Sequence, residues 1–381
     1  MELEKILSNE PAFRVEQAQK AIFQDSISNW DKASNLPKTL RDKLNKELPL
    51  EIKADVLVSA KSNSVKIALL LKDGLKAEAV LMKHKAKGSE QSRRERNTVC
   101  VSSQVGCSMG CLFCLTGKSG LKRSLTAWEI IQQVLFFERL LKLEDSEQDR
   151  KACPERSRRI TNIVFMGMGE PLLNYDNVIE AINILNNKNC FNISMRKISI
   201  STVGIPWAIK KLAKEKIKPV SNASGVANAG WPNLAFSLHT ANQTLRAKLM
   251  PIAKNHDLTE LSRAIDFYIK QTNQRIIFEY LMLKGINDSE KDAFDLAVFV
   301  KQFKAPVNFR AGKNFYFVNL IAYNDFKSQD ILEFKPSSKE KIAMFKEILK
   351  KQGVDAVQRY KFGEDIKGAC GQLAHNIKHE T

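Results

Sequence analysis

Three cysteines lie close together in the stretch CVSSQVGCSMGCLFCLTGKSG. They are Cys107, Cys111 and Cys114, with the spacing C-x3-C-x2-C. A structural zinc site uses four ligands, usually as two C-x2-C pairs, and no matching pair follows in the chain. Three thiolates suit a four-iron cluster that leaves one iron open to another ligand. The triplet alone leaves zinc, an iron–sulfur cluster or covalent thiol chemistry open; its position after a β-type run favours the cluster.

These cysteines fall at the start of a repeating pattern between residues 98 and 336. Short β-type runs alternate there with helix-type stretches, and the runs are TVCVSS, NIVFMG, KISIST, NLAFSLH, RIIFEYLML and YFVNLIAY. Such alternation predicts an α/β fold with a parallel sheet, and six units suit a partial (β/α)6 TIM-like barrel. In barrels of this kind the chemistry lies at the carboxyl ends of the strands. Polar and glycine residues stand at those ends: Gly169, Glu170, Ser201, Thr202, Ser237, His239 and Asn319.

Other segments flank the predicted barrel. Residues 1–62 have helical spacing of apolar residues and form an expected N-terminal helical accessory domain. Residues 63–97 are expected to form a β-hairpin, turning at Asp73–Gly74, followed by a basic loop from Lys83 to Asn97. Residues 337–381 form a C-terminal extension with a helix near Ser338–Lys351. Polar insertions interrupt the pattern near Cys153 and Ala223.

Several other residues that could take part in chemistry also have an ordinary structural interpretation. Cys370 could be a small buried apolar residue, and Cys100 a residue of a strand core. Glu78 could be a solvated strand glutamate, and His239 a structural histidine. Cys190 is expected in the core and Cys153 at the surface.

The composition limits the class of protein. The 381 residues include 60 Lys and Arg against 42 Asp and Glu, a formal charge of +18. This excess favours a polyanionic partner, most simply nucleic acid, although a generally basic proteome gives the same balance. There is no apolar signal-peptide core and no apolar run long enough to span a bilayer. We therefore expect a cytoplasmic protein without a membrane partner, whose clustered cysteines serve metal binding or catalysis.

Several motifs in order resemble one family over nearly the whole chain. They are CVSSQVGC, FMGMGEPLLN, STVGI, FSLH, LMPI, MLKGINDS, VNLIAYN and GEDIKGACGQL, together with the cysteine triplet. This set is similar to the RlmN/Cfr family of bacterial radical S-adenosylmethionine (SAM) RNA methyltransferases. The two insertions and the longer basic loop depart from the family pattern but leave these motifs intact.

The resemblance implies cofactors and roles. Cys107, Cys111 and Cys114 would hold a [4Fe-4S] cluster, whose open iron binds SAM, and two SAM molecules would be used per turnover. Cys370 would accept a methyl group from the first SAM, and a radical formed from the second would remove a hydrogen atom from it. The resulting carbon radical would add to adenine, and Cys100 would release the product by forming a disulfide with Cys370. Glu78 would take a proton from the adduct. The predicted SAM contacts are Gly169, Glu170, Ser201, Ser237, Leu238, His239 and Asn319.

The resemblance implies two substrates, an adenine in 23S rRNA and an adenine in tRNA, each of which would be methylated at C2. GEPL and GEDIKGACGQL favour this over the alternative, Cfr-like methylation at C8. An alternative from another class is an RNA-binding protein with a structural cluster and no catalysis, for which the Cys100–Cys370 pair would have no use. The resemblance also implies an electron-donating reductase or flavodoxin-type protein as a partner, and a monomer.

Overall fold

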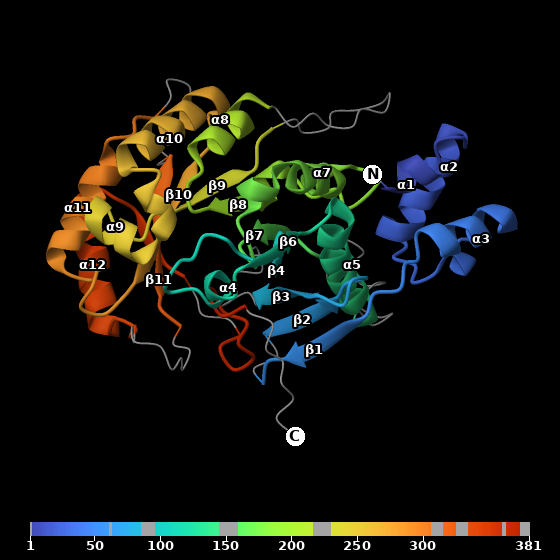
Figure 1. Cartoon of the computed structure of the whole chain (residues 1–381), viewed down its shortest axis with the longest axis horizontal. Helices are drawn as coiled ribbons and strands as arrows, with labels where there is room; N and C mark the ends of the chain where they lie inside the picture. Colours follow the sequence, from blue (N-terminus) through green and yellow to red (C-terminus); the bar gives the residue numbers. More distant parts are fainter. Residues whose placement is uncertain are drawn as a thin grey trace, which may run out of the picture.

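A single large sheet organises the chain. The computed structural model describes residues 2–60, 63–84, 96–144, 159–215, 230–305, 315–324, 334–359 and 363–373. Within these ranges ten strands form one sheet in the order β1-β2-β3-β4-β7-β8-β9-β10-β11-β12 (Figure 1). The strands are β1 (Ala54–Val58), β2 (Ser64–Leu70), β3 (Lys76–His84), β4 (Arg96–Cys100), β7 (Asn162–Phe165), β8 (Ile198–Thr202), β9 (Asn233–Ser237), β10 (Ile276–Met282), β11 (Tyr316–Ala322) and β12 (Ala356–Gln358).

The parallel part of the sheet confirms the predicted partial barrel. Every neighbouring pair from β4 to β12 is parallel, and each of the six β-type runs overlaps one of the strands β4, β7, β8, β9, β10 and β11. Helices follow these strands: α5 (Ala127–Glu144), α7 (Tyr175–Asn186), α8 (Pro206–Lys214), α9 (Gln243–Leu249), α10 (Leu258–Thr272), α11 (Glu290–Lys301) and α12 (Lys339–Lys351). Short turns of helix stand at Pro171–Asn174 (η4), Met195–Lys197 (η5) and Pro251–Lys254 (η6). Because the carboxyl ends of parallel strands share one edge, the predicted site residues are brought to the same side of the sheet.

The antiparallel part continues the barrel sheet instead of standing apart from it. The hairpin β2–β3 is confirmed, with Gly74 at φ +82° in its turn, and β3 pairs antiparallel with β4 so that Val80 lies opposite Cys100. The helical reading of residues 1–62 is wrong for Ala54–Val58, which forms β1 along the edge of β2. Its alternating apolar residues suit a half-buried strand at least as well as a helix. The proposed domain boundaries stay a prediction.

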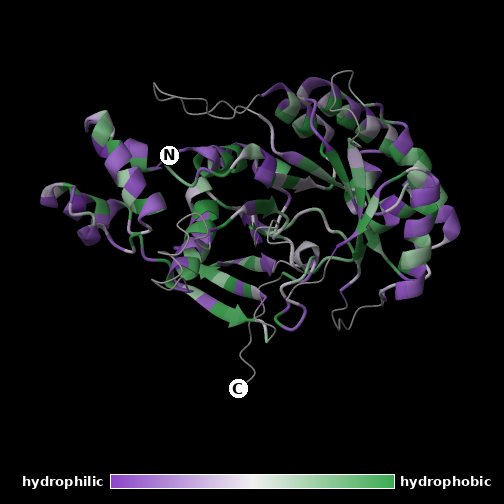
Figure 2. Ribbon diagram, turned by 180° about the vertical axis from the view of Figure 1, so that it is seen from behind, coloured by the Kyte–Doolittle hydropathy of each residue, from purple (hydrophilic) through white to green (hydrophobic). Residues whose placement is uncertain are grey.

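The N-terminal helices pack near α5, away from α11 and α12 (Figure 1). They are α1 (Glu2–Ile6), α2 (Ala12–Gln19), η1 (Lys20–Gln24), η2 (Trp30–Lys32) and α3 (Lys38–Glu47). Arg139 on α5 joins them to the barrel, since its guanidinium donates to the carbonyl oxygens of Ile27 and Leu50 at 2.5 and 2.8 Å. Hydrophilic residues cover much of their surface, whereas the barrel strands are largely apolar (Figure 2).

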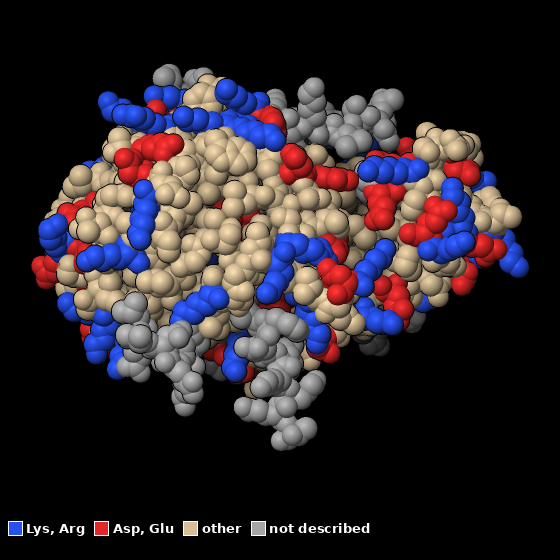
Figure 3. All heavy atoms as spheres, in the orientation of Figure 1, with Lys and Arg blue, Asp and Glu red and all other residues tan. Residues whose placement is uncertain are grey.

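Charge is distributed unevenly over the surface. In the face shown in Figure 3, the N-terminal helices carry acidic and basic side chains side by side. Lys and Arg gather instead along the edge over α8 and α10, where α8 contributes Lys210, Lys211 and Lys214. Residues 2–48 contain as many acidic as basic residues, so the excess positive charge lies elsewhere in the chain.

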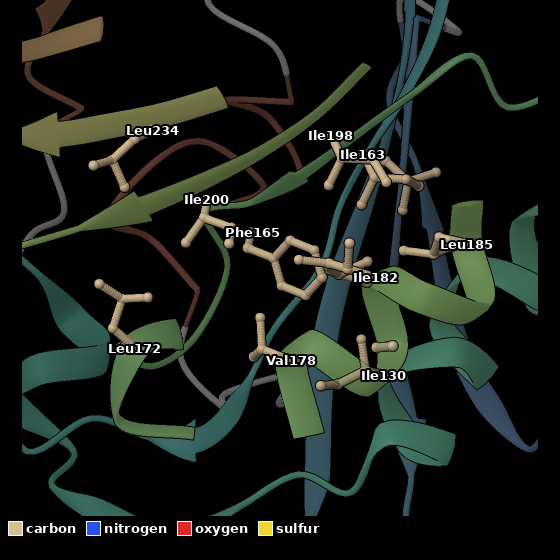
Figure 4. Close-up of a cluster of buried hydrophobic side chains, with 14 of the residues drawn as sticks. Ile130, Ile163, Phe165, Leu172, Val178, Ile182, Leu185, Ile198, Ile200 and Leu234 are labelled. Atoms are coloured by element: carbon tan, nitrogen blue, oxygen red, sulfur yellow. The ribbon is translucent and has the colours of Figure 1, made fainter. Parts of the chain in front are cut away.

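The core lies between the sheet and its covering helices. On β8, buried and partly exposed residues alternate, so that Ile198 and Ile200 face the helices (Figure 4). Ile163 and Phe165 of β7 meet Val178 and Ile182 of α7 in the same cluster (Figure 4). Side-chain caps begin the outer helices: Asp257 accepts from the Glu260 N–H, and Ser289 and Asp292 form a reciprocal capping box.

The segment 363–373 returns to the first loop of the barrel. The carboxylate of Asp365 accepts from the Ser59 hydroxyl at 3.0 Å and from the Ala60 N–H at 2.8 Å. Further along, the Gly371 carbonyl accepts from the Leu115 N–H at 2.9 Å, and the Leu373 carbonyl accepts from the Thr116 hydroxyl. Leu115 begins α4 (Leu115–Lys118) directly after Cys114. These contacts place Cys370 beside the cysteine triplet although they are more than 250 residues apart in the sequence.

Some predictions concern residues outside the described ranges. Cys153, most of the basic loop (residues 85–95) and the insertion around Ala223 lie outside them. Cys190 is buried, as predicted. No helix in the described ranges is both long and apolar enough to cross a membrane.

A buried side chain on α5 ties the end of β4 to the helix layer, and its loss should destabilise the fold. Gln133 donates from Nε2 to the Ser102 carbonyl at 3.1 Å and accepts from the Ser102 N–H at 2.8 Å. We expect Gln133→Leu to lower the free energy of unfolding by roughly 2–4 kcal/mol in urea titrations, because both backbone groups of Ser102 would lose a buried partner. The control is Gln132→Leu, at a partly exposed position on the same helix. Equal losses in the two variants would contradict this account.

Candidate active site

A cavity opens at the carboxyl ends of the parallel strands. Each of five neighbouring strands supplies a lining residue: Phe165 from β7, Ser201 from β8, Ser237 from β9, Glu279 from β10 and Ile321 from β11. The three clustered cysteines and Cys370 line the same cavity. The structure thus brings together thiols, hydroxyls and carboxylates from distant parts of the chain.

A small hairpin holds the cysteine triplet over the strand ends. The strands β5 (Gln104–Gly106) and β6 (Leu121–Ser124) pair, and the Cys107 N–H donates to the Gly120 carbonyl at 3.1 Å. Gly106 has φ +77°, and a Cβ atom there would lie 1.8 Å from the Gly120 oxygen. Only glycine fits such a close approach at this backbone conformation. The Leu112 N–H donates to the Leu249 carbonyl, which fastens the loop to α9.

The three thiols of the triplet are a donor set that suits an iron–sulfur cluster. In the described ranges no three His, Cys, Asp or Glu side chains are grouped closely enough to hold one ion, although the three thiols line one cavity. A zinc site needs its ligands around one point, whereas each thiolate of a cluster binds a different iron atom. Burial raises the pKa of Cys107 to about 12 and that of Cys111 still further. These thiols therefore stay protonated unless a cationic group replaces their protons.

A buried cation near the triplet also suits an anionic cofactor. Arg246 on α9 is fully buried and donates to the Val203 carbonyl at 2.6 Å. Its Nε and Nη1 atoms have no hydrogen-bond partner among the described residues. Burial lowers the pKa of Arg246 to about 10, so it remains charged at neutral pH. Its positive charge acts on Cys111, where a thiolate-bound cluster would compensate it.

Gly169 and Glu170 follow β7 and line the cavity, as the sequence led us to expect. A Cβ atom on Gly169 would meet Gln104 at 2.5 Å, and its φ of +99° also favours glycine. The Glu170 carboxylate accepts from the N–H groups of Leu172 at 3.0 Å and Val203 at 2.9 Å. Burial raises the pKa of Glu170 to about 7. A bound ammonium group would favour its charged form, which suits the predicted contact with SAM.

Three further predicted contacts line the cavity from β8 and β9. The hydroxyls of Ser201 and Ser237 lie 3.4 Å apart. His239 lies two residues beyond Ser237 with φ +59°, and its Nδ1 accepts from the Leu281 N–H at 3.1 Å. Burial lowers the pKa of His239 to about 3, so the ring is neutral, with its proton on Nε2.

Two of the predicted SAM contacts, Leu238 and Asn319, do not line the cavity, whereas Glu279, which binds Asn319, does. The side chain of Leu238 is buried in the core, and its N–H donates to the Glu279 carbonyl at 3.1 Å. The Asn319 amide donates to Glu279 Oε1 at 2.9 Å from the neighbouring strand. Sequence reasoning missed Glu279, although a charged residue within the apolar run IIFEYLM was a signal for it.

Cys100 and Cys370 line a second, smaller cavity. Cys370, Met166, Ile321 and Arg359 line both cavities, so the two are adjacent. Both thiols are free in the structure. Burial raises the pKa of Cys100 to about 12, and charge on the neighbouring Cys370 would raise it further. The geometry therefore brings together the two thiols to which the family resemblance gives a role.

Glu78 is not a solvated residue, and it lines neither cavity. It is fully buried on β3, with Oε1 2.9 Å from the Nζ of Lys66 on β2. The Ser102 hydroxyl donates to its backbone carbonyl at 2.5 Å, which connects β3 to the residues that follow Cys100. Its role as a base stays a prediction.

Comparison with known proteins gives the family. A family model described as the Radical SAM superfamily matches residues 101–297. A curated protein of Carboxydothermus hydrogenoformans named "Probable dual-specificity RNA methyltransferase RlmN" is 39% identical over 96% of this chain and 93% of its own length. A relative of the same name from Dictyoglomus turgidum is 38% identical over 96% of this chain and 91% of its own length. The chain belongs to the RlmN family of radical SAM proteins.

A solved structure agrees with this membership. The radical SAM methyltransferase from Sphaerobacter thermophilus superposes with a TM-score of 0.80 at 34% identity, over 97% of this chain and 96% of its own. The predicted resemblance, fold class and cofactors, a [4Fe-4S] cluster and SAM, are thereby confirmed. The superfamily model matches residues 101–297, so Cys100 and Cys370 both lie outside the matched residues.

Replacing Gly106 should disturb the loop that carries the triplet. We expect Gly106→Ala to lower the iron content of anaerobically reconstituted protein at least several-fold, because the new methyl group would push Gly106 and Gly120 apart. The matched control is Gly285→Ala, where φ is +71° but nothing lies within 4 Å of the added Cβ. Normal iron content in Gly106→Ala would show that the loop tolerates the displacement.

The neutral state of His239 predicts a pH dependence of stability. The unfolded chain takes up a proton near pH 6.5, whereas folded His239 does so only near pH 3, so stability falls as the pH drops through this window. His239→Asn should remove this dependence, and asparagine tolerates the positive φ. We expect the wild type to lose about 2 kcal/mol relative to the variant between pH 7 and pH 5. Parallel curves in urea titrations at several pH values would contradict this expectation.

Proposed function

We propose that this chain methylates C2 of adenine in RNA, using Cys370 as the carrier of the methyl group. The observation that carries the proposal is the position of Cys370. It lines the cavity of the cluster cysteines on one side and the cavity of Cys100 on the other. The relatives named as dual-specificity RNA methyltransferases support the reaction class and favour C2 over C8.

The residues of the larger cavity would hold the cofactors. Cys107, Cys111 and Cys114 would bind the cluster, and Glu170, Ser201 and Ser237 would contact SAM at the strand ends. When bound there, these cofactors supply a methyl group and an organic radical that can remove a hydrogen atom.

The thiols then perform steps that belong to the protein. Cys370 would take up the methyl group at its sulfur and remain attached to the adenine through the resulting methylene group. Glu78 would accept the proton of the adduct. Because Glu78 is paired with Lys66 and lines neither cavity, this step requires Glu78 to leave Lys66 or the surrounding chain to move. Cys100 would attack the Cys370 sulfur, forming a disulfide as the product leaves.

RNA recognition should depend on charge outside the N-terminal helices. From charge alone, the N-terminal helices and the basic loop of residues 83–97 would be the expected phosphate-binding surface, but the balanced charge of the helices gives no support to their part in it. The basic group over α8 and α10 is the better candidate in the face shown by Figure 3. The target adenine must be unpaired or extruded to reach the cavity. The proposed substrates are 23S rRNA and tRNA; a flavodoxin-type electron donor and a monomer stay predictions.

The test is methylation of protein-free rRNA and tRNA by the reconstituted enzyme under anaerobic conditions. We expect 2-methyladenosine in digested nucleosides by mass spectrometry; 8-methyladenosine would assign the alternative regiochemistry. Cys370→Ala should abolish the product, because no carrier remains. Cys100→Ala should leave RNA attached to the protein on denaturing gels, because release lacks its thiol. Cys190→Ala, a buried cysteine elsewhere, is the control. Full methylation by Cys370→Ala would refute the carrier mechanism.

A further inference from the structure

One charged side chain stands where the two cavities meet. Arg359 lines both cavities. Among the described residues, no other Lys or Arg lines either of them. Cys370 also lines both, and Cys100 lines the smaller one. A guanidinium beside two thiols that must react in turn has a clear chemical use, because the thiolate and not the thiol is the nucleophile.

Contacts of its backbone and of its guanidinium hold Arg359 in place. The Arg359 N–H donates to the Leu320 carbonyl at 2.9 Å, which fixes its backbone against β11. Its Nη1 donates to the sulfur of Met166, just after β7, at 3.3 Å. Glu279 Oε2 on β10 lies 3.9 Å from the same nitrogen, too far for a close ion pair. A thioether is a weak and uncharged acceptor, so these contacts orient the cation while neutralising it only in part.

The other titratable groups around these cavities do not supply a second cation. The larger cavity is lined by the cluster cysteines, the carboxyl groups of Glu170 and Glu279, Tyr323, and His239, which is neutral. Negative charge on the Cys370 sulfur raises the pKa of Arg359 above its ordinary range, and its effect is larger than that of Glu279 or Cys100. Arg359 in turn lowers the pKa of Cys100 against the larger effect of burial. The charge of Arg359 therefore acts on both thiols.

Resting on the proposed function, we propose that Arg359 is the electrostatic partner of the carrier thiol: it stabilises the thiolate of Cys370 for methyl uptake and later that of Cys100 for release. Before methyl uptake the thiol proton of Cys370 leaves to solvent. The sulfur electron pair then forms the new bond to the methyl carbon, and the bond from that carbon to the sulfonium of SAM breaks. Its electron pair stays with the departing neutral thioether, S-adenosylhomocysteine.

The test measures thiolate formation without RNA or catalysis. Cluster-loaded protein is alkylated with iodoacetamide at a series of pH values, and each cysteine is followed by peptide mass spectrometry. In Arg359→Gln we expect half-maximal alkylation of Cys370 at least about one pH unit higher than in wild type, or roughly tenfold slower alkylation at pH 7. Arg359→Lys should retain most of the wild-type rate. The control is Arg275→Gln, which removes an arginine just before the opposite end of β10.

A second variant keeps the proposal testable if Arg359→Gln fails to hold its cluster. Glu279→Gln removes the carboxylate that partly neutralises Arg359, so Cys370 alkylation should shift to lower pH. Transfer of labelled methyl from SAM to Cys370 should fall at least tenfold in Arg359→Gln and recover in Arg359→Lys. Unchanged alkylation profiles in both Arg359→Gln and Glu279→Gln, or in Glu279→Gln alone where Arg359→Gln does not fold, would overturn the proposal. Wild-type protein that alkylates as expected but methylates no RNA would overturn the proposed function instead.

Discussion

The docking of residues 363–373 against the first loop of the barrel is the constraint on which the site depends. Among the contacts that hold Cys370 at the cluster side of the cavity, the Gly371 carbonyl accepts from the Leu115 N–H and the Asp365 carboxylate binds the turn after β1. One of these anchors belongs to the loop that carries the triplet, and the other to the antiparallel strands. The carrier thiol is therefore positioned by both parts of the sheet at once.

This arrangement explains why the antiparallel strands continue the barrel sheet. β3 pairs with β4 in a register that sets Val80 opposite Cys100, and Lys66 of β2 donates to the Lys367 carbonyl at 3.1 Å. The antiparallel strands thus cover the edge of β4 and give the C-terminal segment a surface to pack on. An open edge at β4 would leave Cys100 exposed to solvent and its backbone groups unpaired.

The cavity concentrates charge that is costly to bury. Glu170, Glu279 and four thiols line the same cavity, and burial raises the pKa of Glu170, Glu279, Cys107 and Cys111. Two arginines supply positive charge: Arg246 acts on Cys111, and Arg359 acts on Cys370. Such a site is stable when its cationic and anionic ligands are bound, which links cofactor binding to the stability of the fold.

The sequence by itself determined the barrel strands, the cluster triplet and the family. Each depends on local spacing: alternation of strand and helix patterns, C-x3-C-x2-C, and short motifs in a fixed order. It did not predict β1, because a short amphipathic run fits helix and strand alike. Only the tertiary structure decided that Asn319 donates to Glu279 and that Glu78 is paired with Lys66. The same is true of Arg359, which lines two cavities. These relations join residues far apart in the chain, and they follow from how the strands and the C-terminal segment pack, which no local pattern of residues encodes.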